Sequence, residues 1–315
     1  MNRRNFLRAI ALTGAAITVK ESGAMTLLNQ QNNATGKSSG PGNFDLVAVL
    51  GGEPQQMFRA AIAEMGGMSR FVKKGQQVVV KPNIAWDRVP ELAANTNPLL
   101  VGEIVKQCID AGAREVLVFD HTCDDWRKCY SNSGIEDAVK AAGGKMLPAD
   151  QESYYKPVSL SRGKSLKSTK VHEAILNTDV WINVPVLKHH GGSKMTIAMK
   201  NLMGIVWDRR YFHANNLQQC IADVCTLSKK PVLNVVDAYR LMKSNGPQGR
   251  SLADVVLSKG VFLSHDIVAV DTAATNFFNQ VREMPLKDVQ HLFLGEEHKL
   301  GTTDLEKLKI RRKRV

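Results

Sequence analysis

A buried-strand pattern followed at once by a cluster of basic residues dominates the middle of the chain. Residues 180–187 read VWINVPVL, a near-continuous apolar run that is typical of a strand buried on both faces of a sheet. Residues 188–194 read KHHGGSK, and a helix-like segment that carries Lys200 and Asn201 follows from Met195. In an open α/β sheet, ligands bind in the crevice beyond the carboxyl ends of the strands. The stretch therefore predicts a site for an anionic substrate, a metal ion or both.

The same polar segment also has a purely structural interpretation. A Lys-His-His-Gly-Gly turn can be a solvated loop whose glycines supply the positive φ angles of a chain reversal. We favour the functional interpretation because four basic or imidazole side chains fall within seven residues: Lys188, His189, His190 and Lys194.

Polar residues follow other predicted strands at the same kind of position. Lys81, Asn83, Asp120 and Asp237 each lie at or just after the end of a predicted strand. Because parallel strands end at the same edge of a sheet, one crevice could collect these four side chains together with Lys188 and His189. For Asp120, a carboxylate that braces a loop or caps a helix is an alternative interpretation.

A capping pattern lies close to Lys81 in the sequence. Asn95-Thr96-Asn97-Pro98 precedes a predicted helix over residues 99–111, with a side-chain acceptor before the start and proline in the first turn. The free backbone donors of such a helix start can form an anion subsite. Capping alone would give the same pattern, so both interpretations stay open.

The body of the chain alternates strands and helices throughout residues 43–315. This alternation predicts a single α/β domain with a mostly parallel sheet covered by helices on both faces. The 315 residues and 43% hydrophobic content suffice for a substantial core.

Residues 1–42 form a separate segment. Arg3 and Arg4 precede Phe6 and Leu7 and then a short, mildly apolar stretch, which is the arrangement of a twin-arginine export signal. An amphipathic surface helix is the alternative. A polar, glycine-rich linker follows. We therefore predict export through the twin-arginine machinery to the periplasm, with membrane attachment only through the signal segment if that segment stays uncleaved.

The formal charge of +12 is concentrated at the two ends of the chain. Residues 1–40 hold five Lys or Arg and one Glu, and residues 306–315 hold six and one, which leaves about +3 for the rest. The basic sequence IRRKR at residues 310–314 is expected to be a frayed terminus. With no nucleic-acid fold motif and no interleaved aromatic residues, we expect no nucleic-acid partner.

Several motifs together resemble one known family. PVLKHH at residues 185–190 and MKNLMG at 199–204 resemble the core signature of the domain of unknown function 362 family. The resemblance covers roughly residues 45–309 and includes further motifs: VVKPN at 79–83, NTNP at 95–98, VLVFD at 116–120, SNGP at 244–247 and SHDIVAVD at 264–271. In this family's pattern a basic segment ending in His follows the Lys-Asn helix, and His213 fits that place. The resemblance implies a fold and not a reaction.

The five cysteines show neither a Cys-x-x-Cys pair nor a ferredoxin run, which disfavours an iron–sulfur cluster. Free or structural thiols are the first interpretation. A disulfide between Cys123 and Cys129 is the second, since an exported protein meets an oxidising compartment. The cofactor is unknown, and a metal ion stays an open alternative whose ligands the sequence does not identify.

These observations lead to a set of expected site residues. Catalysis is assigned to Lys188, His189, Asp120 and Asp237, with His189 moving a proton and an aspartate orienting a base or a metal. Binding of the substrate is assigned to a second set of residues: Lys81, Asn83, Thr96, His190, Lys200, Asn201, His213 and Asn245.

The expected function is an enzyme that acts on a small anionic substrate, a carboxylate or a phosphate. Two alternatives remain. One is a redox protein whose metal or iron–sulfur centre uses Cys123, Cys129 and histidines. The other is a non-catalytic protein that binds an anion or a cofactor at the same place.

Overall fold

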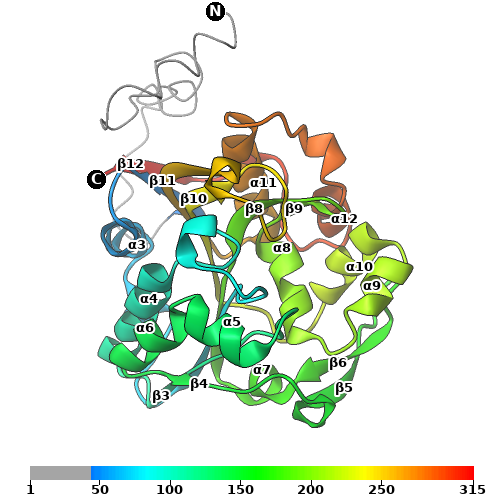
Figure 1. Ribbon diagram of the computed structural model, residues 1–315, viewed down its shortest axis with the longest axis horizontal. Coiled ribbons are helices and arrows are strands. Elements are labelled where there is room, and N and C mark those ends of the chain that lie inside the picture. The colour runs from blue at the N-terminus through cyan, green and yellow to red at the C-terminus, as the bar shows by residue number, and fades with distance from the viewer. Residues whose placement is uncertain (1–43) are drawn as a thin grey trace, which may run out of the picture. The chain divides into compact units, whose positions relative to one another are not determined.

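The computed structural model describes residues 44–315 (Figure 1). The signal segment and linker predicted over residues 1–42 lie outside these described residues, so the boundary and the export signal stay predictions.

A ten-stranded sheet forms the centre of the fold. Its main path runs β12-β1-β11-β10-β7-β2-β3-β4, and neighbours are parallel except where β11 pairs antiparallel with β1 and β10. The strands of this path are β1 (Leu46–Leu50), β2 (Gln77–Pro82), β3 (Glu115–Val118), β4 (Lys145–Met146), β7 (Val180–Val184), β10 (Leu233–Met242), β11 (Val255–Ser264) and β12 (Ile310–Arg314). The predicted α/β class with a mostly parallel sheet is confirmed.

Helices pack on both faces of the sheet and bury two separate cores (Figure 1). In β2, Val78 and Val80 pack into one core and Val79 packs into the other. We name these the α4-side core and the α8-side core. The α4-side helices are α3 (Pro54–Glu64), α4 (Pro98–Asp110), α5 (Trp126–Asn132) and α6 (Ile135–Ala141); the α8-side helices are α7 (Glu173–Asn177), α8 (Ala198–Asn201), α9 (Arg210–Ala214), α10 (Leu217–Val224), α11 (Ile267–Asn279) and α12 (His291–Glu297).

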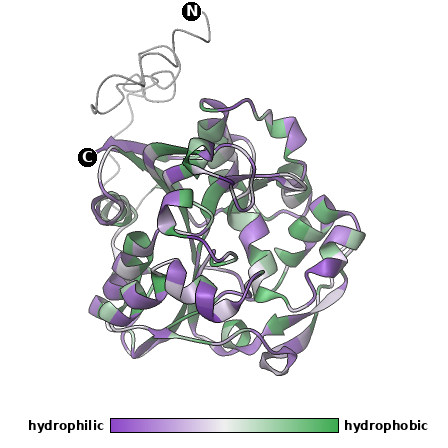
Figure 2. Cartoon of the chain, in the orientation of Figure 1, coloured by the Kyte–Doolittle hydropathy of each residue, from purple (hydrophilic) through white to green (hydrophobic). Residues whose placement is uncertain are grey.

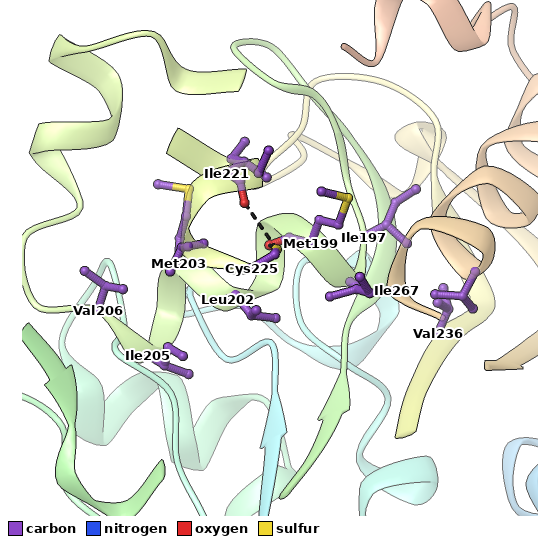
Figure 3. Packing of buried hydrophobic residues seen from close by; sticks show 14 of the residues in the cluster. Ile197, Met199, Leu202, Met203, Ile205, Val206, Ile221, Cys225, Val236 and Ile267 are labelled. Carbon is purple, nitrogen blue, oxygen red and sulfur yellow. Dashed lines mark hydrogen bonds between the residues drawn. The ribbon is translucent and has the colours of Figure 1, made fainter. Parts of the chain in front are cut away.

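The short helix α8 is anchored by apolar side chains. Met199 and Leu202 lie beside Ile221 and Cys225 of the α10 region and beside Ile267 of α11 in the α8-side core (Figure 3). Coloured by hydropathy, the helices that surround the sheet carry both hydrophobic and hydrophilic residues (Figure 2). This packing fixes the part of the chain that carries Lys200 and Asn201.

The central apolar run is two strands and not one strand with a loop. Pro185 separates β7 from β8 (Val186–His190), because proline cannot donate to a strand ladder. β8 then pairs with β10 and turns back antiparallel into β9 (Lys194–Thr196). Lys188, His189 and His190 therefore lie on a strand, which corrects the expectation that they follow one. The predicted helix begins at Ala198 and not at Met195.

Two polar segments also have regular structure. Residues 121–129 contain the start of α5, which Asp125 caps at its N-terminus. The segment after Asp150 forms a separate two-stranded sheet of β5 (Tyr155–Ser159) and β6 (Ser168–His172). One further expectation is corrected: the basic C-terminus is not frayed but is strand β12, paired with β1, where Lys313 contacts Glu64 at 3.0 Å.

Among the described residues, no helix is both long enough and apolar enough to cross a membrane.

The two ends of β11 allow a matched test of the packing. Leu263 is fully buried, whereas Leu257 on the same strand is 55% exposed. We expect Leu263→Ala to lower the free energy of unfolding by about 2–5 kcal/mol, because it leaves a cavity. Leu257→Ala should change it by about 0.5 kcal/mol or less. Urea unfolding followed by circular dichroism measures both, and equal effects would contradict this packing.

Candidate functional site

A row of polar side chains crosses the middle of the sheet on the α8 side. Lys81, Asn183, Asn234 and Ser264 stand in register on β2, β7, β10 and β11, and all four are fully buried. Asn183 Nδ2 donates to Asn234 Oδ1 at 3.0 Å, and Asn234 Nδ2 donates to the carbonyl of Ser264 at 3.3 Å. Buried polar groups are normally hydrogen-bonded, so the helix packed over this row has to supply a polar side chain as a hydrogen-bond partner.

Asn201 of α8 fills that requirement. Its carbonyl and its Oδ1 accept from Lys81 Nζ at 2.7 and 2.9 Å, and its Nδ2 donates to Asn183 Oδ1 at 2.8 Å. Asn83 Nδ2 also donates to Asn201 Oδ1, at 3.1 Å. The opposite end of α8 is held by the carboxylate of Asp271, which accepts from the backbone of Ala198 and Met199 at 2.7 and 2.8 Å. α8 is therefore fixed on the sheet at both ends.

Lys81 is neutralised by an ion pair. Its Nζ lies 2.8 Å from Asp120 Oδ1, and both side chains are almost fully buried. The contact is ionic and not an aligned hydrogen bond, since Oδ1 accepts none while Oδ2 accepts from the backbone of Ile84 at 2.7 Å. Burial lowers the pKa of Lys81, and Asp120 opposes that effect. Gly204 is required here, because a Cβ at that position would overlap both side chains.

Lys188 is buried without a carboxylate partner. Its Nζ donates to Asn83 Oδ1 at 3.2 Å and to the carbonyl of Ala94 at 2.5 Å, and both acceptors are neutral. The side chain is 1% exposed. Burial, together with the positive charge of Lys200, lowers the pKa of Lys188 to about 7.

Lys200 has the weakest partner of the three lysines. Its Nζ donates to the thioether sulfur of Met203 at 3.4 Å, and it forms no ion pair with a carboxylate of residues 44–315. Burial, together with the positive charges of Arg209 and Lys81, lowers the pKa of Lys200 to about 8. We name Lys188, Lys200, His190, His213 and Arg209 the basic cluster.

His190 belongs to this cluster as a neutral hydrogen-bond donor. Its Nδ1 accepts from the backbone of Gly192 and Ser193 at 3.0 and 3.2 Å, which leaves the ring proton on Nε2. Burial lowers the pKa of His190 to about 2, with Lys200 and Lys188 adding to the effect. Partial burial and Lys200 also lower the pKa of His213 on α9.

Arg209 holds a loop against the cluster. Its guanidinium donates to the carbonyls of His121 and Thr122 at 2.7 and 2.6 Å and lies 3.2 Å from Cys123 Sγ. Cys123 is exposed and acts electrostatically on both Lys188 and Lys200. Sequence reasoning did not assign Arg209 to the site, because its contacts are to backbone atoms far away in the chain.

The remaining predicted site residues divide into two groups. Thr96 lies beside the cluster and braces it, accepting from the backbone of Asn83 at 2.8 Å and donating to the carbonyl of Val184 at 2.7 Å. Asp237, His189 and Asn245 have their contacts elsewhere.

Asp237 accepts from the backbone of Asn97 at 2.7 Å, at the start of α4, and burial raises its pKa to about 6. His189 Nδ1 accepts from the backbone of Gly246 at 3.2 Å, and Asn245 Nδ2 donates to Asp254 at 2.6 Å. Since neighbouring residues of a strand point to opposite faces, the structure brings His190 and not His189 to the side of Lys188.

The described residues contain no group of three or more His, Cys, Asp and Glu side chains that could hold a metal ion. Cys123 and Cys129 are both free thiols, the first exposed and the second buried, so the predicted alternative of a disulfide between them is not formed.

The fold and this site define an α/β protein with a buried lysine cluster at its central strands. The chain belongs to the DUF362 family, a domain of unknown function, whose family model matches residues 78–276. A thylakoid-associated protein of Synechocystis sp., sll1697, is 24% identical over 226 residues, which cover 69% of this chain and 68% of that protein.

Two solved structures are similar in fold. The lactate racemase apoprotein from Thermoanaerobacterium thermosaccharolyticum has a TM-score of 0.49 at 12% identity, and a protein from Thermotoga maritima has a TM-score of 0.47 at 10% identity. The matches cover 75% and 79% of this chain. The chain spans 57% and 60% of the length of those two structures.

Loss of the carboxylate at Asp120 should be costly. Asp120→Asn leaves the charge of Lys81 buried without compensation, and we expect the free energy of unfolding to fall by about 3–5 kcal/mol. The control is Asp110→Asn, which breaks an ion pair with Lys106 whose side chains are more than half exposed. That change should cost about 1 kcal/mol or less. Chemical unfolding measures the free energy of unfolding of both variants. Equal losses in the two variants would contradict a buried ion pair between Lys81 and Asp120.

Proposed function

We propose that the chain is an enzyme that acts on a small anionic substrate, a carboxylate or a phosphate, held by the basic cluster. One observation carries the proposal. The charge of Lys200 disfavours the cation of Lys188, yet neither lysine forms an ion pair with a carboxylate in residues 44–315. Asp120, which acts on both lysines, is already paired with Lys81.

Uncompensated buried charge is unfavourable, and a bound anion would relieve it. A buried cation costs several kcal/mol unless it is paired or hydrogen-bonded. The ammonium of Lys200 has three N–H donors and one weak sulfur acceptor. A carboxylate or phosphate oxygen would supply the missing acceptor and a charge-assisted hydrogen bond.

The neighbouring groups suit chemistry next to such an anion. His190 presents an N–H donor whose tautomer is fixed by two backbone N–H groups, so it can stabilise negative charge that develops on a substrate oxygen. Arg209 adds positive charge while its hydrogen bonds keep the Cys123 loop in place. Lys81, Asp120 and Asn201 act as the rigid support of these groups.

The place of action is proposed to be outside the cytoplasm. The paired arginines and short apolar stretch at the N-terminus support export by the twin-arginine route, to the periplasm or to a membrane-tethered position facing it. The thylakoid association stated in the name of the Synechocystis relative agrees with a location at or beyond a membrane.

Anion binding at Lys200 can be measured by isothermal titration calorimetry with sulfate, phosphate and oxalate. Lys200→Met should weaken binding about tenfold to hundredfold, because a hydrogen bond to a charged group contributes about 1.5–3 kcal/mol. The control, Lys287→Met, removes the same charge from an exposed lysine and should change binding less than about twofold. Equal affinities in both variants would refute the assignment.

The pH dependence of sulfate binding is a second test of the role of Lys200. Lys200 is cationic below its pKa of about 8 and loses its charge above that value. Sulfate keeps a constant charge over this range, so its affinity should fall as the pH rises through about 8. Unchanged affinity between about pH 7 and about pH 9 would contradict a role for Lys200.

A further inference from the structure

The hydrogen bonds of Lys188 match a neutral amine. A lysine ammonium has three N–H donors, whereas the amine has two donors and a free lone pair. Lys188 Nζ has two acceptors, Asn83 Oδ1 and the carbonyl of Ala94. An ammonium at this place would leave one buried N–H without a protein acceptor among the described residues.

The surrounding charges act in the same direction. Burial is the main cause that brings the pKa of Lys188 to about 7, and Lys200 and Lys81 disfavour its cation. Cys123 and Asp120 favour the cation. His190, which also lies near, stays neutral because its own pKa is lowered to about 2. A large share of Lys188 is therefore the amine at neutral pH.

A second polar group near Lys188 has no partner. Thr196 stands directly opposite Lys188 on the antiparallel strand β9, so the two side chains lie on the same face of the hairpin. The residue is 3% exposed, and its hydroxyl makes no hydrogen bond. Buried hydroxyls are normally bonded, so an unpartnered one beside an amine indicates the place of a ligand atom.

We propose that Lys188 is the nucleophile of this site and forms an imine with small anions that carry an aldehyde or ketone group. This inference rests on the proposed function and narrows its substrate class to carbonyl compounds with a negatively charged group. Lysines that are desolvated or lie next to another cation are the ones suited to imine formation.

The step balances without a further reactant. The lone pair of Lys188 Nζ attacks the carbonyl carbon, and the C=O π bond breaks to give a carbinolamine. Both amine hydrogens leave with the carbonyl oxygen as water, and a C=N bond forms. The Thr196 hydroxyl and the His190 Nε2–H are the groups that can hydrogen-bond the departing oxygen. Uptake of one proton from water then gives the protonated imine, and the carbonyl of Ala94 is the nearer acceptor for its single N–H.

Reductive trapping tests this inference. The full chain is incubated with glyoxylate and cyanoborohydride at about pH 7, and carboxymethylated lysines are located by peptide mass spectrometry. An ordinary lysine has on the order of a thousandfold less amine than Lys188 at this pH. We expect Lys188 to be labelled at least about tenfold more than any exposed lysine. Lys81, which is equally buried but paired with Asp120, is the internal control and should stay unlabelled.

Two variants and a competing anion serve as controls for the labelling of Lys188. Lys188→Arg should abolish the dominant label, and Lys200→Met or excess sulfate should reduce it about tenfold by removing the anion anchor. A label spread over exposed lysines with none at Lys188 in the unmodified chain would overturn the inference. Sulfate binding measured on the same samples separates the two proposals: binding without labelling rejects the imine alone, and absence of both rejects the anion site as well.

Discussion

The contact of Asn201 with the Lys81–Asp120 ion pair is the interaction on which the site depends. It ties the end of α8 to the polar row of the sheet, while Asp271 holds the beginning of the helix. Lys200 is the residue before Asn201, so its position follows from this anchoring. Lys188 is placed by the same network, because Asn83 bonds both Asn201 and the side-chain nitrogen of Lys188.

The three buried or half-buried lysines differ in how their charge is compensated. Lys81 has a carboxylate and serves the architecture, whereas Lys188 has two neutral acceptors and Lys200 has a thioether. Burying lysines without a carboxylate partner lowers the stability of the fold, and nearby cations add to this: Lys200 disfavours the cation of Lys188, and Arg209 and Lys81 disfavour that of Lys200. Such an arrangement is typical of sites where a ligand completes the charge balance.

Much of this could be predicted from the sequence, and the failures have physical causes. Of the residues expected to share one crevice, Lys81, Asn83, Asp120 and Lys188 lie in one hydrogen-bonded network, whereas His189 and Asp237 have their contacts elsewhere. The consequence of Pro185 was missed: it starts a second strand, and the alternation of that strand brings His190 and not His189 to Lys188. Strand β12 at residues 310–314 was also missed, because its pairing with β1 depends on contacts between residues distant in the sequence.

The central claim is that Lys188 and Lys200 lack charge compensation, and lysine side-chain titration by NMR tests it most directly. With isotope-labelled lysine, and with Lys188→Arg and Lys200→Arg to assign the signals, the account predicts that the signals of Lys188 and Lys200 titrate with pKa values of about 7 and about 8. If Lys188 and Lys200 titrated near the ordinary value of about 10.4, their charges would be compensated in solution and the account would be contradicted.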